Sequence, residues 1–559
     1  MTPPSRAAVR ARAGSSLDDV VPSRATADPA AAEGPEPVVL TVTQQHDLVD
    51  LWTTLVTDVY VHYGQKRALY GYDALRALAA LRRDIPFVDP AGFLRALTAV
   101  VNRLRDQHTQ LFVGAPGADA YVAALPFLVE SFGPYTAPTF VVTKTTDEVP
   151  DPAFAPGVRL TTWNAVPFTR AVDLFADTLT GGRPDARRAR ALETLTQRPL
   201  AYLPPPDELW VDVGYRHPDD PPAEGDRTAR FGWRAIRPES AVTADDRVGA
   251  RTRRAIDVVG ESARRARKLL FATELWERDR EVAQPRAKGS GWLRTSMADA
   301  VAARSVTTSR GTFGYLRLWT FDVRQPGRFA DEVARLLRRL PATGLVVDLR
   351  SNPGGVVDAA ERLFQLFTDR RIEPARFACR ATPAMADIAE ADGNGADLAD
   401  WAGSLRAALD LGEEFSQHLP LADPELCNGL RRAYRGPVVA VVDATTYSCG
   451  DLFAAGVVDH GIGRVVAVGA ATGGGGANVW AGDDVQYAYH AARRPLPPLP
   501  PGIGFAVAVR RMVRSGTSAG LAIEDVGVAG EERYDMTERD VVDGNHDLLE
   551  HCTALLADG

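Results

Sequence analysis

The stretch from Gly436 to His460, GPVVAVVDATTYSCGDLFAAGVVDH, constrains the fold of this chain more than any other. A β-branched run from Val438 to Asp443 is followed by a short polar turn, and from Ser448 onward the apolar residues recur with helical spacing. The pattern predicts a strand, a tight turn and a helix. Ser448 then lies at the carboxyl edge of a sheet, where open α/β folds bind their ligands.

Ser448 has two interpretations at such a turn. The commoner one is an N-cap, in which the hydroxyl accepts a hydrogen bond from the first helical turn. The other is a nucleophile, because the first amides of the helix carry a partial positive charge that stabilises an oxyanion. This stretch alone favours the cap, so the choice depends on the rest of the chain.

Length and composition limit the class of protein. With 559 residues the chain exceeds one hydrophobic core, and two to four domains are expected. Its net charge of −8 argues against nucleic acid as a partner, and no apolar run reaches the length of about 20 residues that a membrane span requires. Residues 1–38 are rich in Ala, Pro, Arg and Ser and lack the apolar segment of a secretory signal, which predicts a disordered tail.

Cysteines and lysines are both scarce. The four cysteines are far apart and form no CxxC pair, so neither a zinc site nor a disulfide framework is expected, and a reducing cytoplasm fits this usage. The chain has only four lysines, Lys66, Lys144, Lys268 and Lys288. No lysine follows Lys288, so a Ser–Lys dyad supplied by the residues of the 292–559 region is excluded.

The order of patterns predicts four further regions. Residues 39–118 have helical periodicity and end in the phrase LRDQHTQL, which places His108 just beyond a helix. Residues 119–236 are strand-rich, and the phrase APGVRLTTWNAVPFTRAV resembles part of a PDZ domain, with an unrelated small β domain as the alternative. Residues 237–291 are charged and helical in pattern, as in a linker helix, a lid or a processed segment. Strands and helices alternate over residues 292–559, which predicts an α/β core with a largely parallel sheet.

Three phrases in this core stand together: LVVDLRSNPGG at 345–355, TTYSCGDLFAAGVVDHG at 445–461 and VGAATGGGG at 468–476. In that order they resemble the C-terminal processing (tail-specific) serine peptidases and their tricorn-type relatives. The resemblance implies a ClpP/crotonase-like α/β core with Ser448 as nucleophile. It also implies an oxyanion hole formed by the backbone N–H of Cys449 and that of Gly354 or Gly355.

The chain departs from the tail-specific branch at the general base. In that branch a lysine lies in the glycine-rich phrase, but here Gly475 stands at its position. The histidine-base branch, which includes the chlamydial protease-like activity factor, has a histidine in a phrase similar to LRDQHTQL and an acid in a phrase similar to AIEDVGV. This resemblance implies a triad of Ser448, His108 and Glu524, in which the acid orients the histidine and stabilises its protonated form.

Several residues near these positions have alternative roles. Asp525 is an alternative acid, but neighbours on a strand point to opposite faces, so only one of the two acids should reach the histidine. Asp451 is expected to support the first helical turn electrostatically. Cys449 is a rival nucleophile whose side chain should point along the helix rather than into the site.

The sequence therefore predicts a multidomain α/β serine peptidase, an endopeptidase or carboxyl-end processing enzyme, that acts on a peptide or protein through an acyl-enzyme. It implies no metal and no cofactor, no nucleic-acid or membrane partner, and leaves a homo-oligomer open. Two alternatives remain on the same fold. One is a non-catalytic ligand- or peptide-binding protein, as in the retinoid-binding relatives of these peptidases. The other is an esterase or amidase that acts on small substrates.

Overall fold

A computed structural model describes residues 38–114, 121–221, 225–236, 253–271, 291–391 and 397–557. The predicted tail lies almost entirely outside the described residues, and so does much of the predicted 237–291 segment. None of the described helices is long and apolar enough to cross a bilayer.

A six-stranded sheet forms the centre of the core, in the order β12-β13-β14-β18-β19-β22. The strands β12 and β13 are antiparallel, and every later neighbour pair is parallel, as the alternating pattern predicts. The bounds are β12 Val301–Thr308, β13 Gly311–Leu318, β14 Leu345–Asp348, β18 Val438–Asp443, β19 Arg464–Val468 and β22 Glu532–Tyr534.

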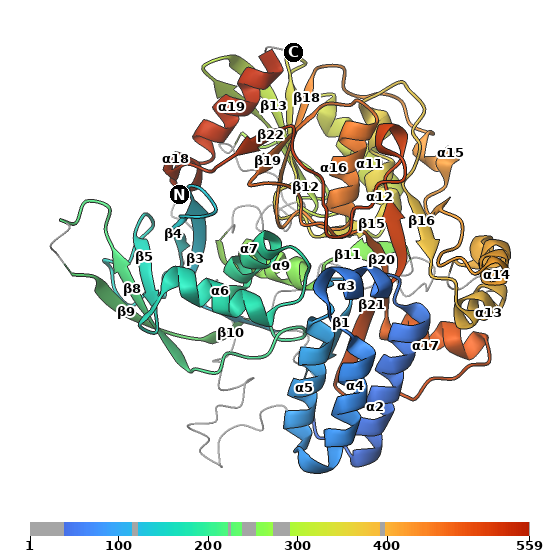
Figure 1. Cartoon of the computed structure of the whole chain (residues 1–559). Coiled ribbons are helices and arrows are strands. Elements are labelled where there is room, and N and C mark those ends of the chain that lie inside the picture. The colour runs from blue at the N-terminus through green and yellow to red at the C-terminus, as the bar shows by residue number, and fades with distance from the viewer. Residues whose placement is uncertain are drawn as a thin grey trace.

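Helices cover both faces of this sheet (Figure 1). On one face α16 (Cys449–Asp459) packs with α12 (Val357–Glu361) and α11 (Pro326–Leu337). On the other face the apolar side of α19 (His546–Ala557) packs on Val346, Val439 and Val441. Since both faces are buried, β14 and β18 read as continuous apolar runs.

A second sheet, in the order β1-β21-β16-β17 with β20 beside β21, lies next to the first. Its longest strand is β21, which pairs antiparallel with β1, β16 and β20. The alternating pattern of strands and helices did not predict this long strand. The bounds are β1 Gln110–Val113, β16 Arg376–Cys379, β17 Leu419–Pro420, β20 Ala477–Ala481 and β21 Ile503–Val513.

The N-terminal helices form a bundle at one end of the molecule (Figure 1). Thr41 begins α2 with a capping box, and Asp73 and Asp89 cap α4 and α5 through their carboxylates. The apolar faces of these helices join the same core cluster as the central sheet. The bounds are α2 Val42–Thr54, η2 Leu55–Val59, α3 Tyr63–Tyr70, α4 Ala74–Asp84, η3 Ile85–Phe87 and α5 Pro90–Asn102.

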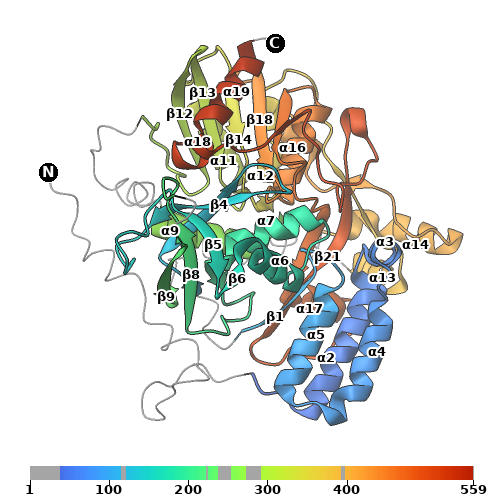
Figure 2. The same cartoon turned by 60° about the vertical axis from the view of Figure 1, so that its left-hand side comes forward.

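A β-rich unit lies beside the core and faces the viewer in Figure 2. Its main sheet has the order β3-β4-β5-β8-β9, and its aromatic core is separate from the main one. Its likeness to a PDZ domain stays a prediction. The bounds are β2 Val122–Ala124, β3 Phe127–Phe132, β4 Thr139–Thr145, β5 Arg159–Trp163, β6 Val166–Pro167, α6 Phe168–Thr178, α7 Pro184–Leu195, β7 Gln197–Pro199, β8 Trp210–Arg216, β9 Arg227–Gly232 and β10 Arg234–Ile236.

The remaining elements link these units. The strand β11 pairs antiparallel with β15, which contains the Gly354-Gly355 pair, and α9 follows directly. The bounds are β11 Arg254–Ile256, α9 Val258–Phe271, β15 Gly354–Val356, η5 Phe364–Leu366, α13 Pro383–Ala391, η6 Ala399–Trp401, α14 Ala402–Leu411, α15 Pro424–Cys427, α17 Gly482–Ala491, η7 Gly516–Ser518 and α18 Glu538–Val542.

Candidate active site

Ser448 lies at the turn between β18 and α16, as the strand-turn-helix pattern predicts. Its backbone has φ 63° and ψ −115°, a left-handed conformation that is unfavourable for a residue with a side chain. Hydrogen bonds hold the turn in place: the Asp443 carboxylate accepts from the amides of Thr445 and Thr446, and Asp451 accepts from the Ser448 amide at 2.7 Å. The fixed turn presents the buried Ser448 hydroxyl at the N-terminus of α16.

His108 contacts this hydroxyl directly. The imidazole Nε2 lies 2.8 Å from Ser448 Oγ, although the two residues are 340 positions apart in the sequence. The loop between α5 and β1 is fixed by Asp106, whose carboxylate accepts from the His108 amide at 2.7 Å and whose carbonyl accepts from Thr180. Burial lowers the pKa of His108 to about 4, against the raising effect of Asp106. The imidazole is therefore neutral at pH 7 and can accept the Ser448 proton.

Glu524 is buried in the same region, but it is hydrogen-bonded to other groups. Its Oε1 lies 2.5 Å from the Lys66 ammonium, and its Oε2 accepts from the Gly476 amide at 2.9 Å. Across the described part of the chain, Nδ1 of His108 has no hydrogen-bond partner. The structure thus pairs Ser448 with His108 and places Glu524 in a neighbouring ionic network. Burial raises the pKa of Glu524 to about 7, although Lys66 lowers it.

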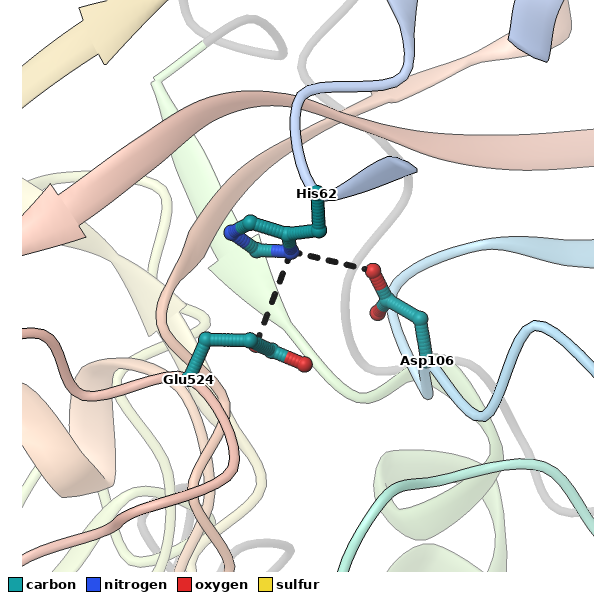
Figure 3. Close-up of side chains that lie close together, drawn as sticks. All are labelled: His62, Asp106 and Glu524. Carbon is teal, nitrogen blue, oxygen red and sulfur yellow. Dashed lines mark hydrogen bonds and ion pairs between the residues drawn. The ribbon is translucent and has the colours of Figure 1, made fainter. Parts of the chain in front are cut away.

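Three residues of this network were missed by the sequence analysis: Lys66, His62 and Asp106. The His62 Nδ1 lies 3.1 Å from the Asp106 carboxylate and 3.8 Å from that of Glu524, as Figure 3 shows. The side chains of His62, Asp106 and Glu524 bring potential cation-binding atoms within 4.8 Å of one another. Lys66 already brings a positive charge to Glu524, so we treat the cluster as an ion-pair network. The only sequence signals were the place of Asp106 two residues before His108 and the scarcity of lysine.

Asp525 and Asp451 have structural partners of their own. Asp525 accepts from Lys66 and from the Tyr70 hydroxyl at 3.0 Å, so it faces α3. Asp451 accepts from the amides of Ser448, Gly474 and Gly475 and from the Thr472 hydroxyl. It therefore joins the Ser448 turn to the glycine run, a wider role than support of the first helical turn. Burial raises the pKa of Asp451 to about 6, and these hydrogen bonds lower it.

Tyr447 explains why Gly475 replaces a lysine. A Cβ at Gly475 would overlap the Tyr447 ring, closer than any real contact. The same ring packs on His108, with 4.9 Å between the ring centroids. The space that a side chain at position 475 would need is occupied by an aromatic ring that buttresses the histidine.

The oxyanion-hole residues implied by the resemblance lie beside Ser448. The amide of Cys449 is the first of α16 and has no acceptor within that helix. Gly354 has φ +99°, and a Cβ there would lie 2.8 Å from Ser448 Cβ and 2.9 Å from Cys449 N. Its own amide donates to the Asn352 side chain at 2.9 Å. Of the two glycines, Gly355 is therefore the better candidate for a second oxyanion donor.

The strand β11 covers the Gly355 amide. Ladder bonds run from Asp257 N to Pro353 O and from Val357 N to Arg253 O. Antiparallel pairs alternate between bonded and non-bonded, so the intervening Ala255–Gly355 pair is in register for hydrogen bonding. The carbonyl of Ala255 therefore faces the Gly355 amide.

Cys449 is not placed to act as a nucleophile. Its thiol is fully buried and donates to the Gly355 carbonyl at 3.3 Å, and His108 Nε2 contacts Ser448 Oγ instead. Burial raises the pKa of this thiol well above its ordinary value, so the reactive thiolate is absent at neutral pH.

Residues 312–483, which include Ser448 and the Pro-Gly-Gly turn, match the model of peptidase family S41. The core of this chain belongs to peptidase family S41. Membership in this family makes the chain a serine-type peptidase, with peptides or proteins as its class of substrate.

Two solved structures of CPAF support the fold. Mature CPAF is similar to the chain with a TM-score of 0.63 and 16% identity, over 92% of this chain and 98% of CPAF. Its complex with lactacystin has a TM-score of 0.62 and 16% identity, over 92% and 99%. The photosystem II D1 C-terminal processing protease has a TM-score of 0.38 and 14% identity, over 93% and 98%. The sequence has no match among curated proteins.

Proposed function

We propose that this S41 peptidase cleaves peptide bonds through an acyl-enzyme on Ser448, with His108 as general base. One observation carries the proposal: the 2.8 Å contact between a neutral, buried imidazole and a hydroxyl held in a strained turn at a helix N-terminus. A serine that served only as an N-cap would need neither the imidazole nor the left-handed backbone.

The chemistry follows from these contacts. His108 Nε2 takes the Ser448 proton as Oγ attacks the carbonyl carbon, and the carbonyl π electrons move to oxygen. The oxyanion faces the Cys449 amide and the Gly354-Gly355 strand. The imidazolium then gives its proton to the leaving amine as the C–N bond breaks. A water molecule attacks the ester by the same route and restores the Ser448 hydroxyl.

The charges of Asp106 and Glu524 stabilise the imidazolium in this proposal. Asp106 raises the pKa of His108 most, and it also fixes the histidine backbone. Glu524 bonds Lys66 and Gly476 rather than His108 Nδ1, so in this proposal it acts on the imidazolium only through its negative charge, across a buried, low-dielectric region. Its ionisation should therefore be visible in the pH dependence of the rate.

The variant Glu524→Gln is expected to change that pH dependence. In the wild type the rate should rise with pH through about 7, where the raised pKa of Glu524 places its loss of a proton. In the variant the rate at pH 8 should be about 10- to 100-fold lower and should vary little until His108 gains a proton near pH 4. The measurement is kcat/KM for an internally quenched peptide from pH 4 to 9. A variant that keeps the rise near pH 7 would exclude Glu524 as its source.

The lid predicted for residues 237–291 can be assigned to a shorter segment. An extended substrate would add to the edge of β15, and β11 (Arg254–Ile256) occupies that edge. We therefore assign the lid role to β11, whose release from β15 would free the Gly355 amide. Limited proteolysis within residues 237–290 should then accelerate the reaction.

The alternative activities predict different substrates. An esterase or amidase should prefer a small ester, whereas a peptidase should cleave a peptide several residues long. The direct test compares an internally quenched peptide library with small esters, each with wild type and Ser448→Ala. Ester cleavage alone would favour the esterase, and peptide binding without cleavage would favour the binding protein.

A further inference from the structure

Lys66 is the buried cation of this site. It lies on α3 and is 2% exposed. Its ammonium contacts Glu524 Oε1 at 2.5 Å, Asp525 Oδ1 at 2.8 Å and the Arg105 carbonyl at 2.9 Å. An ammonium has three hydrogens, and all three have an acceptor here. Lys66 is thus held on one side by the loop that contains Glu524 and Asp525, and on the other side by the loop between α5 and β1 that contains His108.

The charges around Lys66 are unbalanced. Three carboxylates face it, those of the buried Glu524 and Asp106 and of the partly buried Asp525. The other titratable groups near this cluster are two histidines and three tyrosines: His62, His108, Tyr60, Tyr70 and Tyr447. Burial would lower the pKa of Lys66, but Glu524 and then Asp106 raise it, so the lysine is charged at neutral pH. Without this ammonium the carboxylates would repel one another in a low-dielectric region and take up protons.

We propose that Lys66 is a positioning residue of the active site, which holds the Glu524 carboxylate in place and in its ionised form. Lys66 also connects the N-terminal helices to the loop that contains Glu524. The glycine run has no lysine, because Tyr447 fills the space beside Gly475. A lysine enters the site from α3 instead, where it contacts the acid. The catalytic part of this inference rests on the proposed function.

The first test measures labelling of Ser448 by a fluorophosphonate from pH 6 to 9. Lys66→Met should be about 100-fold slower at pH 7, a loss typical of a misplaced catalytic group, and should recover in part by pH 9 as Glu524 loses its proton unaided. Lys66→Arg keeps the cation and should remain close to the wild-type pH profile. In a Glu524→Gln background, Lys66→Met should add little further loss. A wild-type profile for Lys66→Met, or a full additional loss in that background, would overturn the proposal.

The second test needs no activity. The folded protein holds the Glu524 proton more tightly than the unfolded chain, so stability falls as pH rises through the folded pKa of about 7. In Lys66→Met the pKa of Glu524 in the folded protein should be higher, so stability should continue to fall up to a higher pH. The Tm difference between wild type and Lys66→Met should therefore widen between pH 7 and 9, and widen less when both carry Glu524→Gln. Parallel Tm curves would contradict the role of Lys66, whether or not the wild type takes the label. A wild type that takes no label would count against the proposed function instead.

Discussion

Replacing His108 by alanine is expected to slow acylation of Ser448 by about 10⁴- to 10⁶-fold, the range found when a serine hydrolase loses its base. The reason is local: Nε2 at 2.8 Å is the group placed to take the Ser448 proton. The rate should be measured as kcat/KM for peptide hydrolysis and as the rate of fluorophosphonate labelling.

The matched control for this variant is His490→Ala. His490 lies near the end of α17 and is exposed, so its loss should leave the rate unchanged. Near-wild-type labelling of His108→Ala, with the Tm retained, would exclude His108 as the base. Lys66 would then be the next buried group to test.

Replacing Gly354 by alanine is expected to lower kcat/KM by about 10²- to 10³-fold, the scale of a lost oxyanion donor. The added Cβ would lie 2.8 Å from Ser448 Cβ and 2.9 Å from the Cys449 amide, in the space where an oxyanion forms. The φ of +99° adds strain, because side chains rarely adopt this conformation.

Gly403→Ala provides the control for the glycine variant. A Cβ at Gly403, in α14, meets no atom within 4 Å, and alanine favours a helix, so the protein should keep its activity and gain slightly in Tm. Gly354→Ala with a normal Tm and a normal rate would contradict the assignment of this strand to the oxyanion hole.

Local patterns predicted the core of the fold well. The run Val438–Asp443 is β18 in full, because a strand buried on both faces must be continuously apolar. The strand β21 was missed for the opposite reason: its partner β1 lies almost 400 residues earlier in the chain, and no local pattern reports such a pairing. The proline-rich stretch before Ile503 also gave no signal for the start of β21.

Part of the site could be predicted from the sequence. The position of Ser448 at a turn follows from the strand-turn-helix pattern, whereas the roles of Ser448 and His108 came from the family resemblance of the phrases that contain them. The partners of Glu524 were not predictable, because Lys66 on α3 and His62 at its N-cap have no local pattern that places them beside the acid. Only the packing of the N-terminal helices on the core brings them to the acid.

The most direct test of the account is the intact mass of the protein after reaction with a fluorophosphonate, before and after limited proteolysis within residues 237–290. The account predicts one adduct on wild type, on the peptide that contains Ser448, which forms faster after proteolysis. It predicts none on Ser448→Ala. A folded wild type without an adduct in either state, or an equal adduct on Ser448→Ala, would contradict an activated serine at this turn.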